Sequence, residues 1–149
     1  MLPAIDFTHH DVESEALVVR TDHSDDEAWR TVVDLLNQPD LNGFEVRTYL
    51  VDNHAFAGAS PDDVLSAAAE SGLEVVFLAD TATMTGEHPL LAVSTGSQEL
   101  EDGDIELPRE FRLLPPEVNL MHVNLAIGHM DFWEFAYHAS LAADGILRL

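Results

Sequence analysis

The chain has 149 residues, and 28 acidic residues against 6 arginines and no lysine give it a formal net charge of −22. This charge excludes ordinary electrostatic binding to nucleic acid or to an anionic membrane surface. The absence of cysteine excludes disulfides and thiolate chemistry, and the absence of lysine excludes a Schiff base or a P-loop lysine.

The composition still provides for a folded core, because 46% of the residues are hydrophobic. No run of about 18 apolar residues is present to span a membrane. The first residues lack the basic and apolar regions of a signal peptide. We therefore expect a cytoplasmic protein with a polar N-terminal arm at 1–14, which carries His9 and His10, and a single domain at 15–149.

Residues 16–36 predict a strand that leads into a helix. Ala16–Val19 is a continuous apolar run, and Ser24 followed by Glu27 fits a capping box at the start of the helix. One apolar stripe then follows at helical spacing, made of Trp29, Val32, Val33 and Leu36. This is the opening half of a βαβ unit.

Two further strands and one helix are expected downstream. Phe44–Val51 and Leu73–Leu78 have the composition of strands. Between them, Ser60 and Pro61 mark a helix start, with a hydroxyl cap and proline at the first helical position. This alternation favours parallel crossovers in an α/β sheet.

The alternation of strands and helices stops after Asp80. Thr81–Pro89 is too short for a crossover helix, so the apolar run Leu90–Val93 is expected to be an antiparallel strand. The acidic residues 95–108 predict a solvated loop or a hairpin, and Phe111–Leu114 predicts a further short strand. The fold class is therefore α/β, a single domain whose mixed, mostly parallel sheet has about three flanking helices.

The closing segment predicts one more helix. Asp131 and Glu134 fit a capping box, and the apolar stripe behind them ends near Gly145. For Leu120–Ile127 we favour a strand over a helical turn after the two prolines. One core is expected to unite Val18, Val32, Val46, Val76, Leu91 and Phe135.

Four sequence blocks follow one another along the chain: LVVRTDHSDDEAW, VDNHAFAG, FLADTATMTGEHPLLAV and NLAIGHMDFWEFA. Together they resemble a family of short actinobacterial proteins known only as a domain of unknown function, in which similar blocks occur in the same order. The resemblance covers most of 15–147 and departs at 97–107 and at the N-terminus. It implies an α/β fold in a bacterial cytoplasm and brings no activity or catalytic residue.

Candidate ligands gather where the predicted parallel strands end. Asp22 follows the first strand, Asp52 the second and Asp80 the third, with His23 and His54 beside the first two. Ligand sites in α/β folds lie at this edge, and carboxylate oxygens suit Mg²⁺ or Mn²⁺. Acids at such positions also simply cap helices and complement the helix dipole. A phosphate site is disfavoured because the first strand-to-helix turn carries acids and no glycine.

Two functional classes follow. The first is a non-enzymatic, acidic interaction module of the immunity or accessory type, which binds a basic protein partner. The second is a small metal-dependent enzyme or metal-binding domain that uses Asp22, Asp52 and Asp80. An acidic, lysine-free composition also arises from genome base bias or a salty cytoplasm, so the charge by itself does not decide between them.

Overall fold

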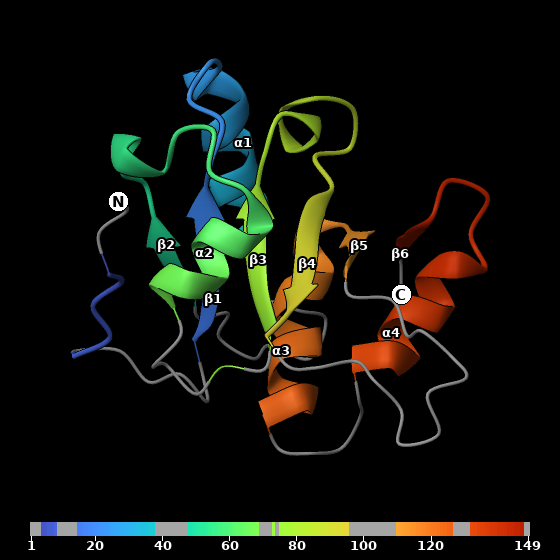
Figure 1. Ribbon diagram of the computed structural model, residues 1–149. Coiled ribbons are helices and arrows are strands. Elements are labelled where there is room, and N and C mark those ends of the chain that lie inside the picture. Colours follow the sequence, from blue (N-terminus) through green and yellow to red (C-terminus); the bar gives the residue numbers. More distant parts are fainter. Residues whose placement is uncertain are drawn as a thin grey trace.

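The computed structural model describes residues 4–8, 15–37, 48–68, 73, 75–95, 110–126 and 132–147. Within these residues six strands form one sheet in the order β2-β1-β3-β4-β5-β6 (Figure 1). The strands are β1 (Ala16–Arg20), β2 (Thr48–Val51), β3 (Val75–Ala79), β4 (Leu90–Ser94), β5 (Glu110–Leu113) and β6 (Ile146–Leu147).

The sheet is mixed. Strand β1 pairs in parallel with β2 and β3, and β5 pairs in parallel with β6, whereas β4 is antiparallel to both β3 and β5. The predicted α/β class and the antiparallel strand after Asp80 are confirmed. "Mostly parallel" is only roughly right, because the antiparallel β4 lies in the middle of the sheet and β6 was not predicted at all.

Four helices accompany the sheet in the part of the chain that the structure describes, where about three were expected. They are α1 (Asp26–Leu36), α2 (Pro61–Ala67), α3 (Val118–Ala126) and α4 (Phe132–Ser140). Three short 3-10 turns are added at η1 (His54–Phe56), η2 (Ala82–Met84) and η3 (Pro115–Glu117). No described helix is long and apolar enough to cross a membrane.

The additional helix replaces a predicted strand. Residues expected as a strand at Leu120–Ile127 form α3 as far as Ala126, so the strand prediction is wrong. The physical reason is a helical stripe that lies against the sheet. Its buried residues are Val118, Met121, His122 and Leu125, at i, i+3, i+4 and i+7.

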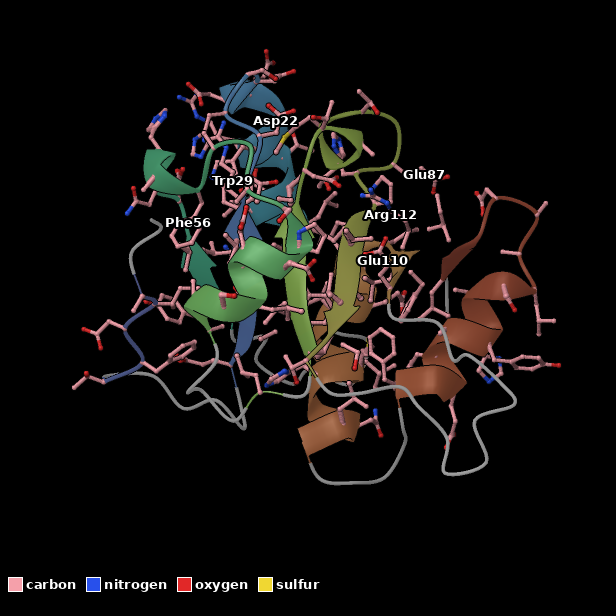
Figure 2. The ribbon with its side chains drawn as sticks, viewed as in Figure 1. Asp22, Trp29, Phe56, Glu87, Glu110 and Arg112 are labelled. Atoms are coloured by element: carbon pink, nitrogen blue, oxygen red, sulfur yellow. The ribbon has the colours of Figure 1, made fainter. Side chains whose placement is uncertain are left out.

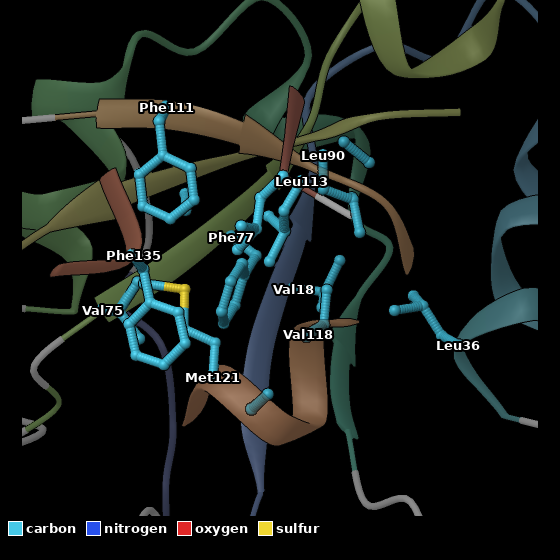
Figure 3. Close-up of a cluster of buried hydrophobic side chains, with 14 of the residues drawn as sticks. Val18, Leu36, Val75, Phe77, Leu90, Phe111, Leu113, Val118, Met121 and Phe135 are labelled. Atoms are coloured by element: carbon cyan, nitrogen blue, oxygen red, sulfur yellow. The ribbon is translucent and has the colours of Figure 1, made fainter. Parts of the chain in front are cut away.

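The sheet separates two cores. On one face α1, α3 and α4 cover Val18 and Phe77 (Figure 3). On the other face η1 and α2 cover Val76 and Leu91, and Ile5 and Phe7 pack beside them. The single core that we predicted is therefore wrong: Val18, Val32 and Phe135 belong to the first cluster, but Val76 and Leu91 belong to the second.

Helix α1 begins one residue later than the predicted capping box requires. Asp25 is the N-cap, and its Oδ1 accepts a hydrogen bond from the Ala28 amide at 3.0 Å. The Ser24 amide instead donates to Asp22 Oδ1 at 2.8 Å. The predicted stripe is confirmed, since Trp29, Val32 and Leu36 are buried and Val33 is partly buried against them.

The capping box of α2 is present as a reciprocal pair. The Asp63 amide donates to Ser60 Oγ at 3.2 Å, and the Ser60 amide donates to Asp63 Oδ2 at 3.1 Å, with Pro61 at the first helical position. Several other predictions lie outside the described residues. These are the His9–His10 pair, residues 44–47 with Val46, nearly all of the acidic loop or hairpin at 95–108, and the Asp131 cap.

Candidate functional site

The carboxyl ends of β1, β2 and β3 meet at one edge of the sheet (Figure 1). Helices α1 and α2 cover opposite faces, so the β1–β3 boundary is a topological switch point, where α/β folds place ligands. Backbone bonds fasten this edge: the Thr21 amide donates to Ala79 O at 2.9 Å, and the Gly58 amide donates to Thr21 O at 2.8 Å. Gly58 has a φ of 74°, which favours glycine.

Arg20, the last residue of β1, is the centre of this edge. Its side chain is only 3% exposed. Nη2 donates to Asp26 Oδ1 at 2.7 Å, Nη1 donates to Asp52 Oδ1 at 3.3 Å, and Nε donates to the backbone oxygen of Asp22 at 2.9 Å. The guanidinium also lies 5.3 Å from the centroid of the Trp29 ring. One buried cation therefore joins the end of β1, the first turn of α1 and the end of β2.

Two histidines lie against this cluster. The His23 and His54 rings are stacked, with centroids 4.2 Å apart and planes inclined by 28°. The His23 side chain is 6% exposed, its Nδ1 lies 3.7 Å from Asp52 Oδ1, and neither ring nitrogen has a hydrogen-bond partner. His54 sits on the exposed side of η1, which buried Phe56 anchors to the second core.

The carboxylates near Arg20 are held in the charged form. Hydrogen bonds from Ser24 are the largest cause that lowers the pKa of Asp22 below its usual value. The hydrogen bond and the charge of Arg20 likewise lower the pKa of Asp26. Both side chains are therefore fully ionised at neutral pH.

Asp80 forms an ion pair with Arg112 of β5. Figure 2 shows Arg112 away from Asp22 and Trp29. Arg112 Nη1 donates to Asp80 Oδ1 at 2.7 Å, and Nη2 donates to Oδ2 at 2.8 Å. The Thr83 amide and hydroxyl add bonds to the same Oδ1. Both oxygens of Asp80 are thus used to hold the β3–β4 connection against β5.

The structure brings the predicted ligands together only in part. Asp52 shares Arg20 with Asp26, Asp22 contributes its backbone oxygen to the same guanidinium, and Asp80 pairs with a different arginine. Among the described residues, no three histidine or carboxylate side chains converge as metal ligands. A Mg²⁺ or Mn²⁺ site at Asp22, Asp52 and Asp80 stays a prediction.

Sequence reasoning missed Arg20, Asp26 and Trp29 as parts of this site. A signal was available, because Arg20 is a lone cation directly after an apolar run in a chain with only 6 arginines. A charged residue that ends a buried strand needs partners, and the nearby acids are the obvious ones. The four-residue spacing of Asp26 and Arg30 instead favours a pair along the surface of the helix.

The edge presents negative charge to solvent. Asp25, Asp26, Glu27 and Asp52 are exposed, and Asp22 is half-buried beside them. We call these five residues the acidic edge. Arg20 offsets one of these five negative charges, so the acidic edge keeps a net negative charge that attracts cations and repels anions.

Comparison with known proteins assigns a family without an activity. The model of a family described as a domain of unknown function, DUF6924, matches residues 15–149. Residues 1–14 fall outside the match, as the resemblance found in the sequence also implied. No curated protein matches the chain. The chain therefore belongs to the DUF6924 family.

Proposed function

We propose that this protein is a non-enzymatic, acidic interaction module that binds a basic protein partner through the acidic edge. An immunity or accessory protein is the type that fits best. The contacts of buried Arg20 carry the proposal. Its guanidinium holds Asp26 and Asp52 in place through ion pairs, while the two carboxylates stay 74% and 46% exposed to solvent. The edge is thus a preorganised set of carboxylates with its counterion hidden from solvent.

The rest of the chain supports this proposal. With a net charge of −22 and no lysine, long-range attraction toward a basic surface is strong at low ionic strength. The sequence has no cysteine nucleophile and no recognised hydrolase or phosphate-binding motif. We place the protein in the cytoplasm of a bacterium, with an actinobacterium as the source that the sequence resemblance implies.

A metal-dependent enzyme or metal-binding domain that uses Asp22, Asp52 and Asp80 has less support. Asp80 uses both oxygens on Arg112, and Asp52 Oδ1 faces Arg20. A cation at either place must compete with a guanidinium that is already bonded there. Displacing Arg20 from Asp52 would leave a buried charge without this partner, which is unfavourable.

The test compares equal charge changes at opposite edges of the sheet. One variant carries Asp22→Asn with Glu27→Gln on the acidic edge. The matched variant carries Asp34→Asn near the end of α1 with Glu110→Gln at the start of β5, which runs parallel to β3. Binding of a fluorescent poly-arginine probe is measured over a series of NaCl concentrations.

We expect the edge variant to bind the probe more weakly than the matched variant, and both affinities to fall as salt screens the charges. Equal losses in the two variants would contradict a focused binding edge. Melting curves in NaCl and in MgCl₂ or MnCl₂ at equal ionic strength test the alternative. A divalent stabilisation that Asp52→Asn removes would favour the metal-dependent class.

A further inference from the structure

Residues 4–8 of the N-terminal arm lie against the domain that the family model matches, although that match begins only at residue 15. The exposure of these residues alternates: Ile5 and Phe7 are partly buried, while the residues between and beside them are exposed. This alternation is typical of an extended segment that lies on a surface. Ile5 and Phe7 both pack against the second core, beside β2 at the edge of the described sheet (Figure 1).

The hydrogen bonds that hold this segment use its main chain. The Ile5 amide donates to Ala67 O at 3.0 Å, and the Tyr49 hydroxyl donates to Asp6 O at 2.7 Å. Ala67 is the last residue of α2, so its carbonyl is one of the terminal acceptors that a helix does not use itself. Burial raises the pKa of Tyr49 above its usual value, so the hydroxyl keeps its proton and stays a donor at neutral pH. One acceptor and one donor are therefore placed to bind the backbone of an extended peptide.

Two apolar side chains supply the contacts that depend on sequence. The Phe7 ring meets the Tyr49 ring edge-on, with centroids 5.6 Å apart and planes inclined by 87°. Ile5 packs on the second core, to which Tyr49, Leu65 and Ala67 also contribute partly buried surface. We call Tyr49, Leu65 and Ala67 the arm-binding surface. Main-chain bonds for affinity and alternate side chains for specificity are a common way in which proteins bind extended peptides.

The segment is held more weakly than the core beneath it. Ile5 and Phe7 are only partly buried, whereas Val64 and Val76 of the second core are inaccessible to solvent. Segments with few buried apolar contacts and with exposed hydrogen bonds open at a small fraction of the free energy of global unfolding. Detachment of residues 4–8 therefore exposes the arm-binding surface while the sheet stays folded.

We propose that the arm-binding surface binds an extended segment of a partner protein that has bulky apolar residues at positions i and i+2, and that Ile5 and Phe7 occupy this site in the free protein. The arm is then an internal competitor, and a partner binds by displacing residues 4–8. This site lies on the α2 side of the sheet and does not rest on the acidic edge. Failure of either proposal leaves the other standing.

The experiment uses the full chain, with a synthetic peptide of residues 2–9 capped at both ends as the probe. In the variant Ile5→Ser with Phe7→Ser, the tethered arm loses both apolar side chains. The control peptide carries the same two substitutions. Calorimetry measures the affinity, and ¹⁵N NMR maps the amide signals that move.

We expect the probe to bind the double variant and to shift the amide signals of Tyr49, Leu65 and Ala67, whereas the control peptide does not bind. The wild-type chain binds the probe about tenfold more weakly, since an arm that covers the surface for about 90% of the time reduces the apparent affinity by that factor.

The two tyrosines of the chain provide a matched pair of substitutions. Tyr49→Phe, added to the double variant, weakens binding of the probe about fivefold, because one hydrogen bond to the peptide backbone is lost. Tyr137→Phe makes the same chemical change at an exposed position on α4 and leaves the affinity unchanged. Equal effects of the two substitutions would contradict the assigned surface.

Hydrogen exchange of the wild-type chain tests the proposal without any substitution. We expect the Ile5 amide to exchange much faster than the amides of β3, because the arm opens while the domain stays folded. If the Ile5 amide exchanges only through global unfolding, residues 4–8 are a permanent part of the fold and the proposal is wrong. Equal binding of probe and control peptide, equal binding by wild type and double variant, or no binding at all also overturns it. A dimer formed by the wild type but not by the double variant would make the occupant the arm of a second copy, and the partner segment would be wrong.

Discussion

Asp80 is a partly buried carboxylate whose environment differs from that of an exposed acid. Its side chain is 27% exposed and bonds to Arg112 through both oxygens. Burial by itself raises the pKa of Asp80, but the hydrogen bonds and charge of Arg112, together with Thr83, outweigh it and lower the pKa below 3.8. Asp80 is therefore a structural residue that holds β3, the β3–β4 connection and β5 together.

Substitution Asp80→Asn is expected to lower the free energy of unfolding by about 1–3 kcal/mol at neutral pH, because it removes charge-assisted bonds to Arg112. The pKa is lower in the folded than in the unfolded chain, so this stabilisation is present above the unfolded value of 3.8 and is lost as the pH falls through the folded value. Urea unfolding at neutral and acidic pH measures both effects. Asp34→Asn is the control, and a difference from wild type that stays constant into acid would contradict the ion pair.

At the scale of elements, the start of α1 shows how a cap is chosen. Ser24 and Glu27 have the spacing of a capping box, yet Asp25 makes the cap and Ser24 bonds to Asp22. The extra residue allows the β1–α1 loop to place Asp26 on Arg20. The cap at Ser24 that the sequence spacing favours is therefore replaced by a cap at Asp25, which is compatible with the ion pair between Arg20 and Asp26.

Asp25→Ala is expected to cost roughly 0.5–2 kcal/mol of stability, since it removes the side-chain bond to the Ala28 amide. Ser24→Ala is expected to cost less, because the bond from its amide to Asp22 remains when the bond from its hydroxyl is lost. Urea unfolding of both variants decides between the two caps. A larger loss of stability in Ser24→Ala than in Asp25→Ala would show that Ser24 is the cap, as the sequence predicts.

Local signals predicted most of the elements, and they failed where two patterns overlapped. The antiparallel β4 followed from the shortness of Thr81–Pro89, and the α2 start followed from Ser60 and Pro61. The segment of α3 was misassigned because apolar residues are so dense there that alternation and helical spacing both fit. The helix is favoured because it packs Val118, Met121 and Leu125 together against one face of the sheet, and this tertiary contact cannot be read from the local sequence.

At the scale of the whole molecule, the sheet separates two hydrophobic cores. Side chains alternate across each strand, so Val76 and Phe77 of β3 point to opposite faces and join different clusters. The candidate site depends on the same arrangement. Asp52 reaches Arg20 only because β2 lies beside β1, which is why the sequence predicted acids at this edge but not the arginine that joins them.

Val76→Ala is expected to lower the free energy of unfolding by about 2 kcal/mol, because the side chain is fully buried between the sheet and the α2 side of the molecule. Val33→Ala, at a partly buried position on α1, is the control and is expected to cost less. Equilibrium urea unfolding measures both. A loss of only a few tenths would contradict a central place for β3 in the second core.

The buried Arg20 also affects how the edge opens. Its guanidinium bonds at once to the β1–α1 loop, the first turn of α1 and the residue after β2. None of these segments can detach without breaking bonds that restrain the others. We therefore expect the amide protons of all three to exchange with solvent through one shared opening event, as a single cooperative unit rather than as independently fraying loops.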